Sequence, residues 1–182
     1  MKVYRLILFI LLSVSSHAFA GNASFHAIGP FGGIVTSVVE DADGTIFIGT
    51  EGGGVYKTND NGNTWVSVSS GLTNPFVYTL AASQGSVFAG TKAGIFKSSD
   101  KGKNWIKEQG IISEKLIPFL TVDKDGVVYA SVWASGAARK IKDNWELLNN
   151  ELHNTFVNEI AFTKEGTIIA ATEGGVYKLD KG

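Results

Sequence analysis

The stretch Ser98-Ser99-Asp100-Lys101-Gly102-Lys103-Asn104-Trp105 follows the plan of Thr58-Asn59-Asp60-Asn61-Gly62-Asn63-Thr64-Trp65, and the aspartate, glycine and tryptophan keep their places in both. The two tryptophans stand 40 residues apart, and Trp145 follows after another 40. A unit that recurs every few tens of residues cannot bury its apolar face alone, so its copies must pack against one another. The spacing therefore predicts a repeat architecture.

Each copy of the repeat has the pattern of four short strands. It opens with a β-rich segment such as Val77–Ala81, and a turn such as Gln84-Gly85 then supplies the positive φ that a tight hairpin needs. A third strand such as Gly94–Lys97 leads into the aspartate-containing turn, and a fourth begins at the tryptophan. Four antiparallel strands every 40 residues are typical of a β-propeller blade, whereas the coils of a linear β-solenoid are usually shorter.

We therefore predict an all-β propeller of about four blades. The blades run over about 34–76, 77–116, 117–156 and 157–182, the last completed by 24–28. In that segment Phe25 takes the place of a tryptophan, and the last copy stops before a fourth strand of its own. The N-terminal strand could thus close a four-bladed ring by covering an unpaired sheet edge. A part of a larger propeller would end in the same way, so both arrangements remain open, as does self-association of an incomplete ring.

The N-terminus has the order of a secretory signal peptide. Lys2 and Arg5 precede the apolar run Leu6–Leu12, and a polar stretch ends in Ala18-Phe19-Ala20. The apolar run is far shorter than the roughly 20 residues that a membrane-spanning helix needs. We therefore expect a signal peptide at 1–20, a propeller domain at 21–182, and no stable membrane insertion after cleavage.

Composition narrows the partners and the compartment. Loss of Lys2 and Arg5 with the signal peptide leaves 14 basic against 17 acidic side chains, which does not suit nucleic acid binding. The chain contains no cysteine, so an exported domain must rely on its apolar core, and 44% of its residues are hydrophobic. These features favour an exported protein, periplasmic or secreted, most naturally from a bacterium.

The two aspartate-containing phrases resemble the Asp-box, the Ser/Thr-x-Asp-x-Gly-x-Thr-Trp motif of bacterial neuraminidase repeats, which also occurs in sortilin-type receptors and xyloglucan-cleaving glycosidases. The roles expected in these turns are structural. Asp60 and Asp100 accept backbone N–H groups, Gly62 and Gly102 allow the chain to reverse, and Trp65, Trp105 and Trp145 bury their rings between sheets. The third copy, Lys140–Trp145, keeps its tryptophan but lacks the glycine, which predicts a differently shaped turn there.

The resemblance does not bring an activity with it. Sialidases resemble one another in holding the substrate carboxylate with three arginines, and residues 21–182 contain one arginine, Arg139. A cation site at Asp60 and Asp100 would need several converging oxygens. The only histidines after residue 20 are His26 and His153. We therefore expect no metal, no cofactor and no sialidase activity.

A glycosidase with two carboxylates remains the main enzymatic alternative, because such a pair must only flank one bond at roughly 5–10 Å. The candidate carboxylates are Glu40, Glu51, Glu114, Asp123, Glu159 and Glu173. The sequence does not place them relative to one another. A third alternative is an assembly factor similar to the propeller proteins that help build photosystem II in cyanobacteria.

A propeller commonly binds its ligands at one rim, which is built from the connections between blades and the hairpins between second and third strands. Positions that repeat in every blade belong to the scaffold, whereas exposed positions that differ are free for recognition. The candidates at this rim are Phe31, Phe76, Tyr78, Glu114, Lys115, Phe119, Trp133, His153, Phe156 and Asn158. Aromatic side chains among polar groups suit a protein or a glycan ligand, and we expect a binding module without catalytic residues.

Overall fold

The computed structural model describes residues 26–30 and 33–179, and within these ranges the chain forms 15 strands and no helix. Nothing in the described ranges could therefore cross a membrane as a helix. The expected signal peptide at 1–20, Phe25 of the expected closing strand, and the rim candidate Phe31 all lie outside the described residues.

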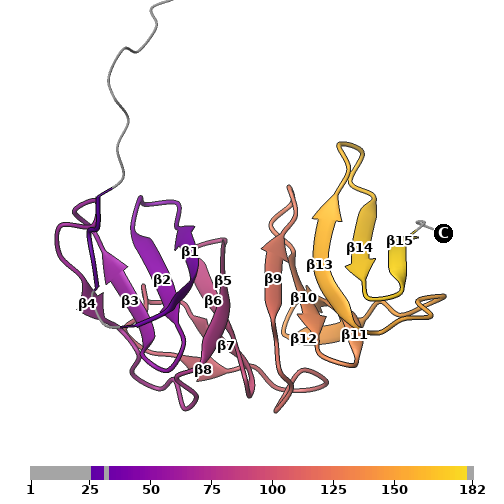
Figure 1. Ribbon diagram of the computed structural model, residues 1–182, viewed down its shortest axis with the longest axis horizontal. Coiled ribbons are helices and arrows are strands. Elements are labelled where there is room, and N and C mark those ends of the chain that lie inside the picture. The colour runs from indigo at the N-terminus through magenta and orange to yellow at the C-terminus, as the bar shows by residue number, and fades with distance from the viewer. Residues whose placement is uncertain (1–25, 31–32, 180–182) are drawn as a thin grey trace, which may run out of the picture.

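The strands form four separate antiparallel sheets, each in chain order (Figure 1). The first contains β1 (Val35–Glu40), β2 (Ile46–Thr50), β3 (Gly54–Thr58) and β4 (Val66–Ser67), and the second contains β5 (Val77–Ser83), β6 (Ser86–Thr91), β7 (Gly94–Ser98) and β8 (Ile106–Lys107). The third contains β9 (Phe119–Val122), β10 (Val128–Val132), β11 (Gly136–Ile141) and β12 (Asn144–Leu147), and the fourth contains β13 (Val157–Phe162), β14 (Ile168–Thr172) and β15 (Gly175–Leu179). These sheets are the predicted propeller blades.

The blades follow one another along an open arc. The first strand of each blade contacts the first strand of the next, from β1 to β5, β9 and β13. Figure 1 shows the first and fourth sheets at opposite ends of the arc. Apolar clusters fill the spaces between neighbouring sheets, since each one combines side chains from two successive blades. The core is therefore a series of interfaces, as expected of a repeat that cannot bury its apolar face alone.

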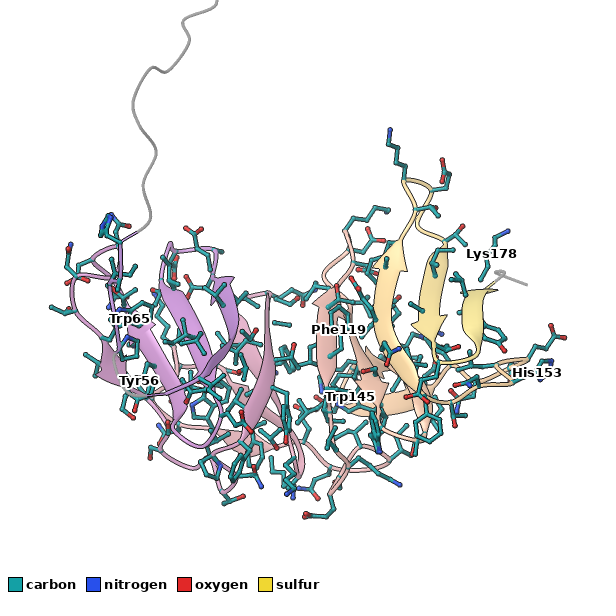
Figure 2. The ribbon with its side chains drawn as sticks, in the orientation of Figure 1. Tyr56, Trp65, Phe119, Trp145, His153 and Lys178 are labelled. Atoms are coloured by element: carbon teal, nitrogen blue, oxygen red, sulfur yellow. The ribbon has the colours of Figure 1, made fainter. Side chains whose placement is uncertain are left out.

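Two of the repeated tryptophans, Trp105 and Trp145, lie in these interfaces. Trp105 and Trp145 are buried, and Trp65 is half-buried (Figure 2). The indole N–H of Trp105 donates to the carbonyl oxygen of Val68 in the preceding blade at 2.6 Å. A buried aromatic ring of this size contributes on the order of 2 to 3 kcal/mol. Trp105 thus connects the second blade to the first through both its ring and its N–H.

The N-terminal segment packs on the first blade in the same manner. The indole N–H of Trp65 donates to the carbonyl oxygen of Ile28 at 2.9 Å, so Ile28 corresponds to Val68 one blade later. Residues 26–30 thus lie where the end of a preceding blade's fourth strand would lie. In the described ranges no strand pairs with the free edge of β15, and the completion of the last blade by residues 24–28 stays a prediction.

The carboxylates of the two aspartate-containing turns accept hydrogen bonds from donors of their own turns. Asp60 Oδ1 accepts the Thr58 hydroxyl at 2.7 Å and the Thr64 N–H at 2.9 Å, and Oδ2 accepts the Thr64 hydroxyl at 2.6 Å. Asp100 accepts the side-chain amide and the N–H of Asn104, both at 2.8 Å. Because these donors favour the charged carboxylate, the pKa of Asp60 and that of Asp100 both fall to about 2.

The glycines let these turns rest directly on the preceding blade. The φ angles of Gly62 and Gly102 are 89° and 81°, in the region that side chains rarely adopt. A Cβ atom at Gly102 would lie 2.9 Å from Val68 Cγ2, and one at Gly62 would lie 2.4 Å from Ile28 Cδ1. Glycine is therefore required both for the backbone conformation and for the close approach.

The third blade departs from this pattern, as its sequence predicted. Strand β11 continues to Ile141, which pairs with Asn144 at the start of β12. Only Lys142 and Asp143 lie between the strands, and Lys142 has a φ of 52°. Three residues separate the end of β11 from Trp145, whereas six separate the ends of β3 and β7 from Trp65 and Trp105.

Candidate binding rim

The antiparallel strands divide the connections between two edges of the molecule. We call one edge the connection rim; it holds the inter-blade segments and the hairpins between the second and third strands of each blade. The opposite edge, the turn rim, holds the hairpins between first and second strands and the turns between third and fourth strands. Apart from Phe31, which lies outside the described residues, the binding candidates lie on the connection rim or at the strand ends beside it, and Asp60 and Asp100 lie on the turn rim.

The backbone of the connection rim repeats from blade to blade, while its side chains change. The N–H of Lys92 donates to Phe76 O at 3.2 Å, and that of Trp133 donates to Leu116 O at 3.0 Å. The same bond occurs in the first and fourth blades, from Glu51 and Glu173. One repeated backbone position therefore presents glutamate, lysine, tryptophan and glutamate in turn. Such variation on a fixed frame is typical of a recognition surface.

Phe76 forms the first of two aromatic sites on this rim. Its side chain is 39% exposed, and its N–H donates to the side-chain oxygen of Asn74 at 3.1 Å. The ammonium nitrogen of Lys92 lies 5.8 Å from the centre of the Phe76 ring. The asparagine thus holds the turn that presents the ring, and the lysine adds a positive charge beside an apolar surface.

Trp133 and Phe156 form the second aromatic site. The two rings meet edge to face with their centres 5.4 Å apart, and Trp133 is 48% exposed. The N–H of Phe156 donates to the side-chain oxygen of Asn154 at 2.9 Å, which repeats the arrangement of Asn74 and Phe76. A large ring held by a second ring suits an anchor residue of a binding surface, because little side-chain freedom is lost on contact.

The remaining rim candidates differ in how far their side chains are exposed. Phe119 lies on β9, where it packs against the cluster between the third and fourth blades (Figure 2). Tyr78 is half-buried and Asn158 is exposed, and both lie at irregularities where the register of the first strand shifts. His153 is exposed on the connection before β13, with its ring centre 6.5 Å from that of Tyr177.

Glu114 and Lys115 lie in the connection between the second and third blades. The Glu114 carboxylate forms an ion pair with Lys107, and the Lys115 carbonyl oxygen accepts the N–H of Gly94 at 2.6 Å. The connection is thereby fastened to the second blade through both residues. Lys92 was missed among the rim candidates, although its position corresponds to that of Trp133 and the repeat could have identified it.

Two of the candidate carboxylates of a glycosidase, Asp123 and Glu114, lie on opposite rims. Asp123 Oδ1 accepts the N–H groups of Asp125 and Val127, each at 2.9 Å, and Oδ2 accepts the Tyr129 hydroxyl at 3.2 Å. Burial, together with Asp123, raises the pKa of Tyr129. Asp123 thus stabilises a hairpin on the turn rim, whereas Glu114 lies on the connection rim. Within the described ranges, no three histidine or acidic side chains gather as a metal site would require.

The comparisons with known proteins identify propellers. The family model "Two component regulator propeller" matches residues 29–52, which lie in and before the first blade. The search of curated proteins finds no match. The extracellular domain of BT4673 from B. thetaiotaomicron superimposes with a TM-score of 0.66 at 16% identity, over 79% of this chain and 21% of that one.

Two further solved structures have the same fold. YCF48 bound to D1 peptide superimposes with a TM-score of 0.60 at 22% identity, over 80% of this chain and 50% of that one. An ancestral GH74 enzyme superimposes with a TM-score of 0.67 at 20% identity, over 81% of this chain and 23% of that one. The chain thus spans between about a fifth and a half of these proteins, and the likeness shows a β-propeller fold.

Proposed function

We propose that this chain is an exported propeller module that binds a protein or a glycan at its connection rim. The observation that carries the proposal is the pair of exposed aromatic sites, Phe76 beside Lys92 and Trp133 against Phe156, on a backbone frame that is otherwise repeated. Exposed aromatic anchors surrounded by polar groups are typical of binding surfaces. The similar fold of YCF48, solved with a bound peptide, supports a protein or peptide ligand.

We further propose that the turns at 58–65 and 98–105 are Asp-boxes, on the strength of their hydrogen bonds and their tryptophans. Export is proposed from the order of residues at the N-terminus, and the extracellular domains among the similar structures support it. The assembly-factor alternative is a special case of the same activity, since it also requires a protein ligand.

The proposal predicts that binding depends on the rim aromatics. The purified chain would be screened against a peptide library and a glycan array, and the best ligand would be titrated by calorimetry. We expect the Phe76→Ala and Trp133→Ala variants each to lose about tenfold or more in affinity, because truncation of an anchor residue typically costs above 1 kcal/mol. Ile106→Ala is the matched control, since Ile106 is 75% exposed on the outer strand β8, away from the rim.

Equal losses in all three variants, or none in the rim variants, would contradict the assignment of the rim. Hydrolysis of a polysaccharide panel by the purified chain would instead favour the two-carboxylate glycosidase.

A further inference from the structure

A pocket of about 280 Å³ opens on the turn rim between the second and third blades. Lys97, Lys140 and Lys142 line it together with Phe88, and no acidic side chain does. The ammonium nitrogens of Lys97 and Lys140 lie 5.8 Å and 5.9 Å from the centre of the Phe88 ring. Two cationic groups therefore flank one apolar surface.

The three lysines differ in their partners. Lys140 forms an ion pair with the largely buried Glu108, whose carboxylate also accepts the indole N–H of Trp145 at 2.9 Å. Its charge is thereby offset. No oxygen of the described residues accepts a hydrogen bond from the Lys97 or Lys142 ammonium group, and the Lys97 ammonium lies over the Phe88 ring. The pocket thus holds two cations without an acceptor.

The equivalent interface, between the first and second blades, shows what such a lysine binds. Lys57 has the same place in β3 as Lys97 has in β7, and its ammonium group donates to the carbonyl oxygen of Lys101 at 2.8 Å. Lys101 belongs to the aspartate-containing turn of the second blade, and its own ammonium group pairs with Asp43 at 2.6 Å. At this interface a carbonyl oxygen therefore accepts from one lysine, and a carboxylate pairs with the other.

Both acceptors are missing one blade later. The Lys142-Asp143 hairpin is shorter than the turn that contains Lys101, so nothing corresponds to the Lys101 carbonyl. Gln84 stands in the first hairpin of the second blade where Asp43 stands in that of the first, and its amide carries no charge. The shortened turn also leaves space over Phe88, whereas Gly102 of the longer turn packs against the equivalent Phe47.

We propose that this pocket binds a compact oxyanion group, a sulfate, phosphate or carboxylate. The oxygens of the group take the place of the missing Lys101 carbonyl and Asp43 carboxylate, with Lys97 and Lys142 as charged donors and Ser86 and Gln84 as neutral ones. The attraction between the charges is screened less beside Phe88 than in open solvent. This site lies on the opposite rim from the proposed binding surface and does not depend on it.

The test is a titration of the purified chain with sulfate, phosphate and acetate at constant ionic strength, followed by amide NMR. We expect saturable shifts confined to the lining, above all at Gly126 and Val127. Lys97→Met should raise the Kd about tenfold, the loss of one charge-assisted hydrogen bond. Lys142→Met should also weaken binding while leaving the Phe88 surface untouched. Lys57→Met is the matched control and should change the Kd less than twofold.

A further titration with oligogalacturonate, a glycan that carries carboxylates, identifies the source of a bound carboxylate. Binding tighter than that of acetate, and lost in Lys97→Met, would support a carboxylate carried on a glycan, whereas equal binding would support a free small anion. Shifts that do not saturate, or an equal loss in Lys97→Met and Lys57→Met, would overturn the proposal.

Discussion

The three repeated tryptophans occupy unequal environments, and their contributions to stability should differ accordingly. Trp105 is 3% exposed and donates its N–H across the blade interface, whereas Trp65 is half-buried and donates its N–H to the N-terminal segment. The cost of truncating a ring depends on how much surrounding structure is left unfilled. The repeat assigns these residues the same role, but their positions along the arc decide how much each one buries.

We predict that Trp105→Ala lowers the free energy of unfolding by about 3 to 5 kcal/mol, measured by urea denaturation. Trp65→Ala should cost clearly less. The loss expected for Trp105→Ala is comparable to the whole stability of many domains, so Trp105→Phe serves as a milder variant. It keeps most of the apolar ring and should cost about 1 to 2 kcal/mol for the lost hydrogen bond. Equal losses in the two alanine variants would contradict the interface role of Trp105.

The turn aspartates predict how stability depends on pH. The pKa values of Asp60 and Asp100 fall from 3.8 to about 2 on folding, so the unfolded chain takes up protons at a higher pH than the folded chain. Their contribution is fully present above pH 3.8 and is lost as the pH falls towards 2. We expect the free energy of unfolding, measured with urea across this pH window, to fall less steeply in the double variant Asp60→Asn/Asp100→Asn than in the native chain.

Asp143→Asn is the control for this measurement. Asp143 lies in the corresponding turn of the third blade, and its side chain accepts no hydrogen bond from the described residues. The Asp143→Asn variant should show the same dependence of stability on pH as the native chain. If the Asp60→Asn/Asp100→Asn variant also showed that dependence, the assigned role of the turn carboxylates would be refuted.

At the scale of the element, the turns combine two separate requirements that glycine meets. Gly102 has a positive φ and lies against the preceding blade, whereas Gly85 has a φ of 73° with no atom within 4 Å of an added Cβ. The first position therefore tests both backbone strain and contact. The second tests backbone strain alone.

We predict that Gly85→Ala costs about 1 kcal/mol, the usual penalty for a side chain in the left-handed region. Gly102→Ala should cost about 1 to 3 kcal/mol more, because the added methyl group would force Val68 to move. Thermal and urea unfolding of both variants would measure the difference. Equal costs would show that the turn does not depend on close packing against the neighbouring blade.

Most of the strands could be predicted from the sequence because their signals are local. The alternation of β-rich segments and glycine turns identified the first, second and fourth strands of the third blade, while β11 (Gly136–Ile141) was not assigned because Ala137 and Ala138 lack a strong β signal. The irregular register at Tyr78 and Asn158 could not be predicted, since it arises from pairing between strands.

At the scale of the whole molecule, the two rims separate two kinds of surface. The connection rim carries exposed aromatic side chains on a repeated backbone, and the turn rim carries the hydrogen-bonded turns together with the cationic pocket. Each site arises where one blade departs from the others: Trp133 replaces a charged residue, and the Lys142-Asp143 hairpin replaces a longer turn. A repeat makes such departures easy to recognise, because the unmodified copy stands beside them.

The period of 40 residues and the turn chemistry of Asp60, Gly62 and Trp65 were enough to specify the blade, because these signals act between residues close in the chain. The packing of blades in space decided what the period could not. It placed Lys97 beside a shortened turn of the next blade, Lys92 over Phe76, and Ile28 against Trp65. Contacts between neighbouring blades join residues that lie tens of positions apart, and no local pattern encodes which side chains will meet there.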